Sequence, residues 1–103
     1  MLNEQSVMSI PIHVRAKIHS GGVLLLSYRR GFNGEQGLEV NRVGAEMFFL
    51  CDGASAISKI ALVIAERHRV RYDTVLADVI VLFEELERRE WLVLARPVVI
   101  RTP

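Results

Sequence analysis

The sequence predicts a single α+β domain of winged helix-turn-helix type, in which three N-terminal antiparallel strands pack on three helices. Up to about residue 40, apolar and polar residues alternate around glycine-containing turns, whereas beyond it apolar residues recur at helical spacing. The chain has 103 residues and half of them are hydrophobic, which is enough for one core. We therefore expect one domain over residues 1–103, with its core at about residues 10–93.

Two strands are expected in the first 28 residues. Every even position over Ile10–Ile18 is apolar, a period of two that predicts a strand with these positions on a buried face. Pro11 cannot donate to a strand ladder, so this strand should begin at a sheet edge. A turn at Ser20–Gly22 then leads to an antiparallel partner strand at Val23–Tyr28.

A third strand and a first helix follow. Three glycines in Arg29–Gly37 predict a long loop, after which Leu38–Val40 forms a short strand. Asn41 is suited to capping a helix over Arg42–Cys51, because its side-chain oxygen can accept from a first-turn N–H. Gly53 stands where a left-handed residue would end that helix.

Two further helices are predicted after residue 54. Ser55 is expected to cap the second helix, which closes at Glu66–His68, and Asp73 to cap the third, which runs to about Arg89. On a helical wheel Asp78 and Leu82 lie on one shoulder of the third helix. The core stripe of that helix comprises Val75, Leu76, Val79, Phe83 and Leu86.

Composition restricts the compartment and the partners. The formal net charge is +1, so no strong field attracts polyanions. The one cysteine, Cys51, excludes an internal disulfide and suits a reducing cytoplasm. The first residues lack a signal peptide, and apolar runs such as Ile60–Ala65 are too short to span a bilayer. We expect a soluble, cytoplasmic domain without a membrane partner.

No catalytic constellation is visible. The three histidines are far apart and the carboxylates lack metal-ligand spacing, so neither a metal nor a cofactor is expected. Cys51 is better explained as a small buried apolar group than as a nucleophile. Asp78 is harder to assign, because it is either paired with a nearby Arg or a polar anchor at the rim of a groove. The sequence therefore predicts a protein that is not an enzyme.

A winged-helix DNA-binding regulator is the alternative function. In that case the third helix would enter the major groove and present basic or amide side chains. It carries Asp73, Asp78 and two glutamates instead, which phosphates would repel. Only the arginines at Arg67–Arg71, just before the helix, could contact the backbone, so nucleic acid is an unfavoured partner.

Eight short motifs along the chain are informative when they are taken together and in this order. They are Leu38–Asn41, Ala45-Glu46, Leu50–Gly53, Ile57–Ile64, Asp78-Val79, Leu82-Phe83, Leu86 and Trp91-Leu92. Together, over roughly residues 10–93, they resemble the PqqD family of pyrroloquinoline-quinone biosynthesis and the related recognition domains of ribosomally made, modified peptides. Glu90 departs from the glycine common in that family, and the Arg29–Gly37 loop is long. Whether the chain is the pyrroloquinoline-quinone protein or a relative stays open.

The resemblance implies a non-catalytic adaptor with three strands on three helices. Such a protein holds the leader of a precursor peptide and delivers it to a modifying enzyme, commonly a radical SAM enzyme. The leader adds as an antiparallel strand to the third strand and lies against the third helix. An open edge of this kind also favours self-association, so a homodimer would be unsurprising.

The resemblance places the peptide site on two elements. The accepting edge comprises Leu38, Glu39, Val40 and Asn41, while Arg42 and Arg71 are candidates for contacts with acidic leader side chains. The third helix would contribute the groove wall, with Asp78, Leu82 and Glu85, and an apolar floor, with Val75 and Val79.

Overall fold

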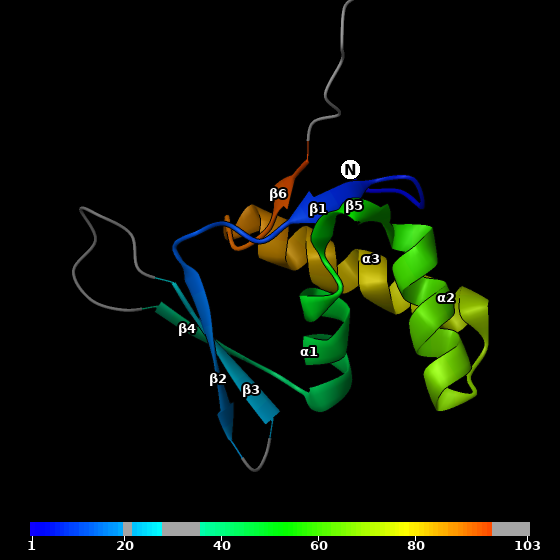
Figure 1. Ribbon diagram of the computed structural model, residues 1–103, viewed down its shortest axis with the longest axis horizontal. Helices are drawn as coiled ribbons and strands as arrows, with labels where there is room; N and C mark the ends of the chain where they lie inside the picture. Colours follow the sequence, from blue (N-terminus) through cyan, green and yellow to red (C-terminus); the bar gives the residue numbers. More distant parts are fainter. Residues whose placement is uncertain (20–21, 28–35, 96–103) are drawn as a thin grey trace, which may run out of the picture.

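The computed structural model describes residues 1–19, 22–27 and 36–95, in which two small sheets accompany three helices (Figure 1). In Figure 1 the sheet β2-β3-β4 lies on one side of α1, and α2 lies on the other. The elements in chain order are β1 (Val7–Ser9), β2 (Val14–His19), β3 (Gly22–Ser27), β4 (Gln36–Val40), α1 (Arg42–Phe49), β5 (Asp52–Ala56), α2 (Ile57–His68), α3 (Tyr72–Arg88) and β6 (Val93–Leu94).

The sheet β2-β3-β4 is antiparallel throughout, which confirms the predicted hairpin and third strand. Val23 of β3 pairs with Ile18 on one side and with Val40 on the other. β3 is therefore the middle strand, and β2 and β4 are the two edges. Residues 20–21 and most of the predicted Arg29–Gly37 loop lie outside the described part of the chain, as does the expected end of the strand at Tyr28.

The expected buried face of the first strand is wrong. Val14 is buried, but Ala16 is exposed, Ile18 is 78% exposed and Ile12 is 96% exposed. A turn closed by the Val14 N–H and the Pro11 carbonyl, 3.1 Å apart, separates β1 from β2, so Ile10–Ile18 is not one strand. α1 packs on β3 and β4, so the apolar face of β2 extends past the helix that would cover it.

The second sheet, β5-β1-β6, was not predicted, because β5 contains no large apolar residue and β1 and β6 are very short. Its presence corrects two helix boundaries, the end of α1 and the start of α2. α1 ends at Phe49, and Gly53, although left-handed at φ 77°, lies in β5. Ser55 also lies in β5, and its hydroxyl donates to Asp52 over 3.0 Å, so it does not cap α2.

Of the three predicted helix caps, the structure has one. Asn41 caps α1 as predicted, with its Oδ1 accepting from the Gly44 N–H at 2.7 Å. Arg71 takes the cap position of α3, so Asp73 lies in the first turn instead. Four members of the predicted core stripe of α3 are buried, namely Val75, Val79, Phe83 and Leu86.

Both ends of the described chain contribute to the core. Trp91 and Leu92 are almost fully buried, as expected for the closing hydrophobic pair. Leu2 and Met8 are also buried, so the core begins before residue 10. Within the ranges that the structure describes, no helix is long and apolar enough to cross a membrane.

Candidate functional site

A groove separates the outer edge of β4 from α3. In the described part of the chain β4 pairs with β3 alone, so its other edge is open. The groove encloses about 480 Å³. We call it the β4–α3 groove, and its lining residues are Glu39, Val40, Asn41, Val43, Gly44, Met47, Asp78 and Leu82.

The alternation of β4 determines which main-chain groups point into this opening. A Cβ on Gly22, at the start of β3, would lie 2.7 Å from the Val40 carbonyl oxygen, so this oxygen points toward β3. In an antiparallel strand the N–H and C=O of one residue point to the same side, and those of the next residue point to the other side. The N–H and C=O groups of Glu39 and Gly37 therefore point to the open edge, where another strand could pair with them.

The groove continues along α3 as a second hollow of about 490 Å³ that shares Asp78 and Leu82 with it. Glu85 lines this hollow and accepts from Arg89 at 2.8 Å, a bond that holds the pKa of Glu85 below its usual value. Among the residues described, nothing pairs with the carboxylate of Asp78. Of the two alternatives for Asp78, pairing with an arginine is not seen within the described residues. Asp78 is therefore, in that part of the chain, a carboxylate without a neutralising partner where the two hollows meet.

Most of the expected site residues meet at this place. Glu39, Val40, Asn41, Asp78 and Leu82 line the groove together, and Glu85 lines its continuation. Their role in peptide binding stays a prediction. Leu38 also lies on β4, where its side chain packs partly buried against the core.

The two residues expected to form the floor are not among those that line the groove. Val75 and Val79 are 4% and 0% exposed and face the core beneath it. α1 supplies the floor instead, through Val43, Gly44 and Met47. Arg42 and Arg71 are also absent from the lining; Arg71 lies 3.8 Å from Asp73 at the start of α3.

Gly44 was the missed signal for this floor. Glycine inside a helix lowers the stability of that helix by about 1 kcal/mol relative to alanine. A glycine in α1 therefore indicates that a side chain at this position would meet a close neighbour. The structure provides one, because a Cβ there would lie 3.2 Å from Asn41 Oδ1 and 3.5 Å from Leu82 Cδ2. Gly44 thus leaves room for the Asn41 side chain that caps α1, while Leu82 of α3 lies at an ordinary contact distance.

The remaining reactive groups do not form a second site. Cys51 is buried, and this burial raises the pKa of its thiol to about 12, so the thiol stays protonated at neutral pH. That environment fits the structural role expected for it. Over residues 1–19, 22–27 and 36–95, no three His, Cys, Asp or Glu side chains gather to hold a metal ion.

The fold and the groove agree with a family assignment. The family described as Coenzyme PQQ synthesis protein D (PqqD) matches residues 22–92, from the start of β3 to the buried Leu92. The chain therefore belongs to the PqqD family, as its motifs indicated. No curated protein sequence matches it significantly.

Two solved structures share the fold. One is the solution structure of the PqqD truncation of Methylobacterium extorquens PqqCD, a stand-alone recognition element for ribosomally synthesised and post-translationally modified peptides. It has a TM-score of 0.75 and 18% identity, covering 90% of this chain and 95% of that one. The other is TbiB1 in complex with the TbiA(beta) leader peptide, with a TM-score of 0.63 and 24% identity, covering 81% and 92%. At these identities the likeness concerns the fold.

Proposed function

We propose that this protein is a peptide-binding adaptor that captures the leader of a ribosomally made precursor peptide by strand addition to β4. It then presents the peptide to a modifying enzyme, for which a radical SAM enzyme is the expected type. The observation that carries the proposal is the open edge of β4 beside a groove against α3 in a PqqD-family fold. TbiB1, which shares the fold, was solved with a leader peptide bound.

Strand addition uses the main chain for affinity and alternate side chains for specificity. The outward N–H and C=O groups of Glu39 and Gly37 would bond the leader backbone. Every second leader side chain would then point toward the groove, where the partly buried Val43 and Leu82 offer apolar surface. Asp78 favours a basic leader side chain by charge complementarity. The leader we expect is therefore apolar and basic at groove positions, rather than acidic as Arg42 and Arg71 had indicated.

The proposed role is binding without catalysis, in a cytoplasm that keeps Cys51 reduced. It is supported by the description of the Methylobacterium relative as a recognition element and by the protonated, buried thiol. No observation favours DNA binding as a second candidate. Carboxylates such as Asp78 and Glu85 stand on the outward side of α3, where phosphates would have to lie.

An amide NMR titration of the labelled protein tests this proposal. Candidate leader peptides from neighbouring precursor genes are titrated in one series and a random DNA duplex in another. We expect shifts over residues 37–41 and on the side of α3 that carries Asp78, Leu82 and Glu85, with peptide alone. Shifts confined to Arg67–Thr74, with the duplex alone, would contradict the adaptor function.

A pair of proline variants makes the test specific to the strand edge. Glu39→Pro removes an outward N–H and should weaken leader binding about tenfold or more. Ala16 of β2 pairs with Leu25 of β3, which pairs on its other side with Leu38 of β4. Because Leu25 directs its main-chain groups to β4, the N–H of Ala16 points to the outer edge of β2. Ala16→Pro is thus the matched control and should bind normally, as should Glu39→Ala, which keeps the backbone donor. Equal binding by both proline variants would exclude strand addition to β4.

A further inference from the structure

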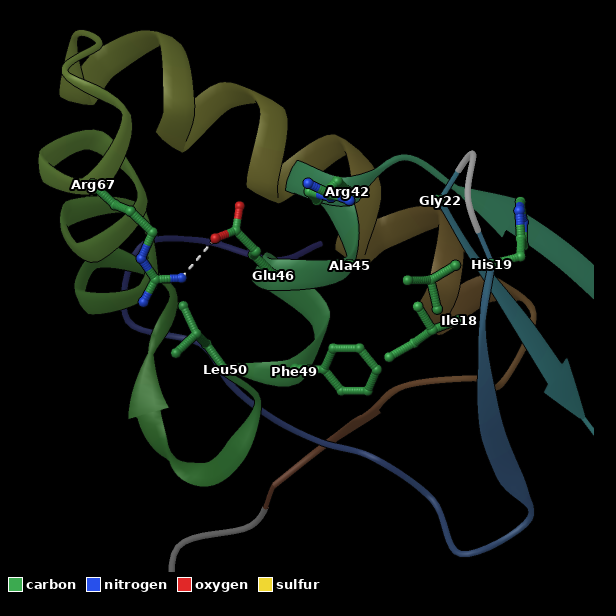
Figure 2. A pocket seen from close by; sticks show the side chains of 10 residues that line it. Ile18, His19, Gly22, Arg42, Ala45, Glu46, Phe49, Leu50 and Arg67 are labelled. Atoms are coloured by element: carbon green, nitrogen blue, oxygen red, sulfur yellow. Dashed lines mark hydrogen bonds and ion pairs between the residues drawn. The ribbon is translucent and has the colours of Figure 1, made fainter.

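A second hollow lies across α1 from the β4–α3 groove, between α1 and the β2–β3 hairpin (Figure 2). It encloses about 320 Å³. Ile18 of β2 is 78% exposed and Phe49 of α1 is 50% exposed, while Val23 beside them is buried. We call this hollow the Ile18–Phe49 pocket, and Ala45 and Leu50 add to its apolar lining.

The two exposed side chains are held in place rather than scattered. Figure 2 shows Ile18 and Phe49 facing one another across the pocket. The ring of Phe49 packs edge-on against Phe48, with centroids 5.5 Å apart, and Phe48 is buried in the core. Ile18 is fixed by its register with Val23. Large apolar side chains grouped in an ordered surface hollow are typical of a protein interaction site.

The charges around the pocket decide which partner fits. Glu46 is neutralised, because it accepts from Arg67 at 2.8 Å and contacts His68 at 2.7 Å. Arg42, by contrast, makes no ion pair within the described part of the chain, so the rim carries one unmatched guanidinium. A two-fold dimer would bring the same residues to both sides, and Glu46, the one carboxylate among the described lining residues, is already paired with Arg67, so a second copy of this chain offers Arg42 no free partner.

We propose that the Ile18–Phe49 pocket docks a second protein through an acidic and apolar segment. A bulky aliphatic or aromatic side chain of that segment lies between Ile18, Val23 and Phe49, and a neighbouring carboxylate pairs with Arg42. The partner is the peptide-modifying enzyme, an identity that rests on the proposed function. Because α1 separates the pocket from the β4–α3 groove, leader and enzyme bind at the same time without competing.

Two synthetic amphipathic peptides of equal length, one of Leu and Glu and one of Leu and Lys, test the chemistry of the pocket. Titrated into the labelled full chain, the Leu/Glu peptide should shift amides at Ile18, Val23 and Phe49 and bind about tenfold tighter than the Leu/Lys peptide. Arg42→Glu should reverse this preference. Ile18→Ser, a change at an exposed position that leaves the fold intact, should weaken binding of the Leu/Glu peptide.

The controls separate this proposal from the adaptor function. Leu82→Ser, in the β4–α3 groove, should leave binding of the Leu/Glu peptide unchanged. Equal binding of the two peptides, or shifts in the groove instead of the pocket, would overturn the docking surface even where the leader still binds. Concentration-dependent shifts at Ile18 and Phe49 without peptide would overturn it in favour of a second copy. If the Leu/Glu peptide binds in the pocket but no leader peptide binds, the docking surface is supported and the adaptor function is contradicted.

Discussion

The two sides of α1 have contrasting surfaces. On one side, within the described residues, the β4–α3 groove combines an open strand edge, a partly apolar lining and an unpaired carboxylate, that of Asp78. On the other side the Ile18–Phe49 pocket is mainly apolar, and in the same part of the chain the guanidinium of Arg42 has no ion-pair partner. The first surface suits an extended backbone with basic side chains, and the second suits a side chain with an acidic neighbour. Surfaces that differ in both shape and charge can hold two ligands at once.

One short segment joins the two surfaces. Val40 lines the groove, and its carbonyl oxygen lies against Gly22, which lines the pocket. Asn41 follows directly after β4 and caps α1, so it joins the strand edge to the helix. The contrast between the β4–α3 groove and the Ile18–Phe49 pocket therefore depends on the local geometry of residues 40–44.

The largest expected effect is that of proline at Val40. If the Val40 N–H points to β3, Val40→Pro removes a ladder hydrogen bond and leaves a carbonyl of β3 unpaired, at a cost of about 2 kcal/mol. Glu39→Pro, whose N–H points outward, should cost less than about 1 kcal/mol. Urea unfolding of both variants measures the difference. A reversed order would mean that Val40 and not Glu39 faces the open edge.

That prediction distinguishes Val40 from Glu39, which the sequence analysis placed together on the accepting edge. Local patterns were sufficient for the β2–β3 hairpin, β4 and the core stripe of α3, because periodicity and the Asn41 cap act over a few residues. The rim residues Asp78 and Leu82 also followed from the helical wheel. The floor at Val43 and Met47 did not, because it depends on how α1 crosses α3.

The pocket was missed for a related reason. The alternation over Ile10–Ile18 placed Ile18 in the core, and a period of two cannot tell whether a helix covers that part of the strand. The strands β1 and β5 were missed because their pairing joins residues almost 50 positions apart, such as Val7 and Ala56, and Asp52–Ala56 has no strand-like composition. Tertiary contacts decided what the local pattern left open.

Loss of the Asn41 cap should have the next largest effect. Asn41→Ala leaves the Gly44 N–H without its 2.7 Å partner and should lower the free energy of unfolding by about 1 kcal/mol. Asn41→Asp keeps a side-chain acceptor at this position and should retain most of the free energy of unfolding that Asn41→Ala loses. Because the cap lies between both surfaces, Asn41→Ala should weaken leader and Leu/Glu peptide binding together. An effect on the leader alone would show that the two surfaces do not share this support.

Gly44→Ala should separate the surfaces with a smaller change in stability. Alanine gains up to about 1 kcal/mol of helix propensity, but its Cβ would crowd Asn41 Oδ1 at 3.2 Å. We expect little net change in unfolding free energy. Because the new methyl group fills the groove floor near Leu82, leader binding should weaken severalfold, whereas binding at the Ile18–Phe49 pocket should not. Calorimetric titration with both peptides gives the two affinities, and parallel losses would contradict the separation.

The smallest expected effect concerns the pH dependence of the pocket side. The hydrogen bond from Arg67 holds the pKa of Glu46 below its usual 4.5. A carboxyl group with a lower pKa in the folded state stabilises the fold above its unfolded pKa, and that contribution is lost as the pH falls through the folded value. Glu46→Gln should therefore cost stability at pH 7, and the deficit should shrink as the pH falls below the usual pKa of 4.5 and through the lower folded pKa.

The deficit should be below about 1 kcal/mol, because the pair is partly exposed and screened by solvent. Asp78→Asn provides the matched control on the groove side, since it removes a carboxylate that no neighbour in the described chain neutralises. It should show no comparable deficit at pH 7. Urea unfolding at a series of pH values from 7 downward measures both variants. A deficit for Glu46→Gln that stays constant through the acid titration of Glu46 would mean that the side chain stabilises α1 by packing rather than by its charge. The ion pair with Arg67 would then make no measurable contribution to the stability of the pocket side of α1.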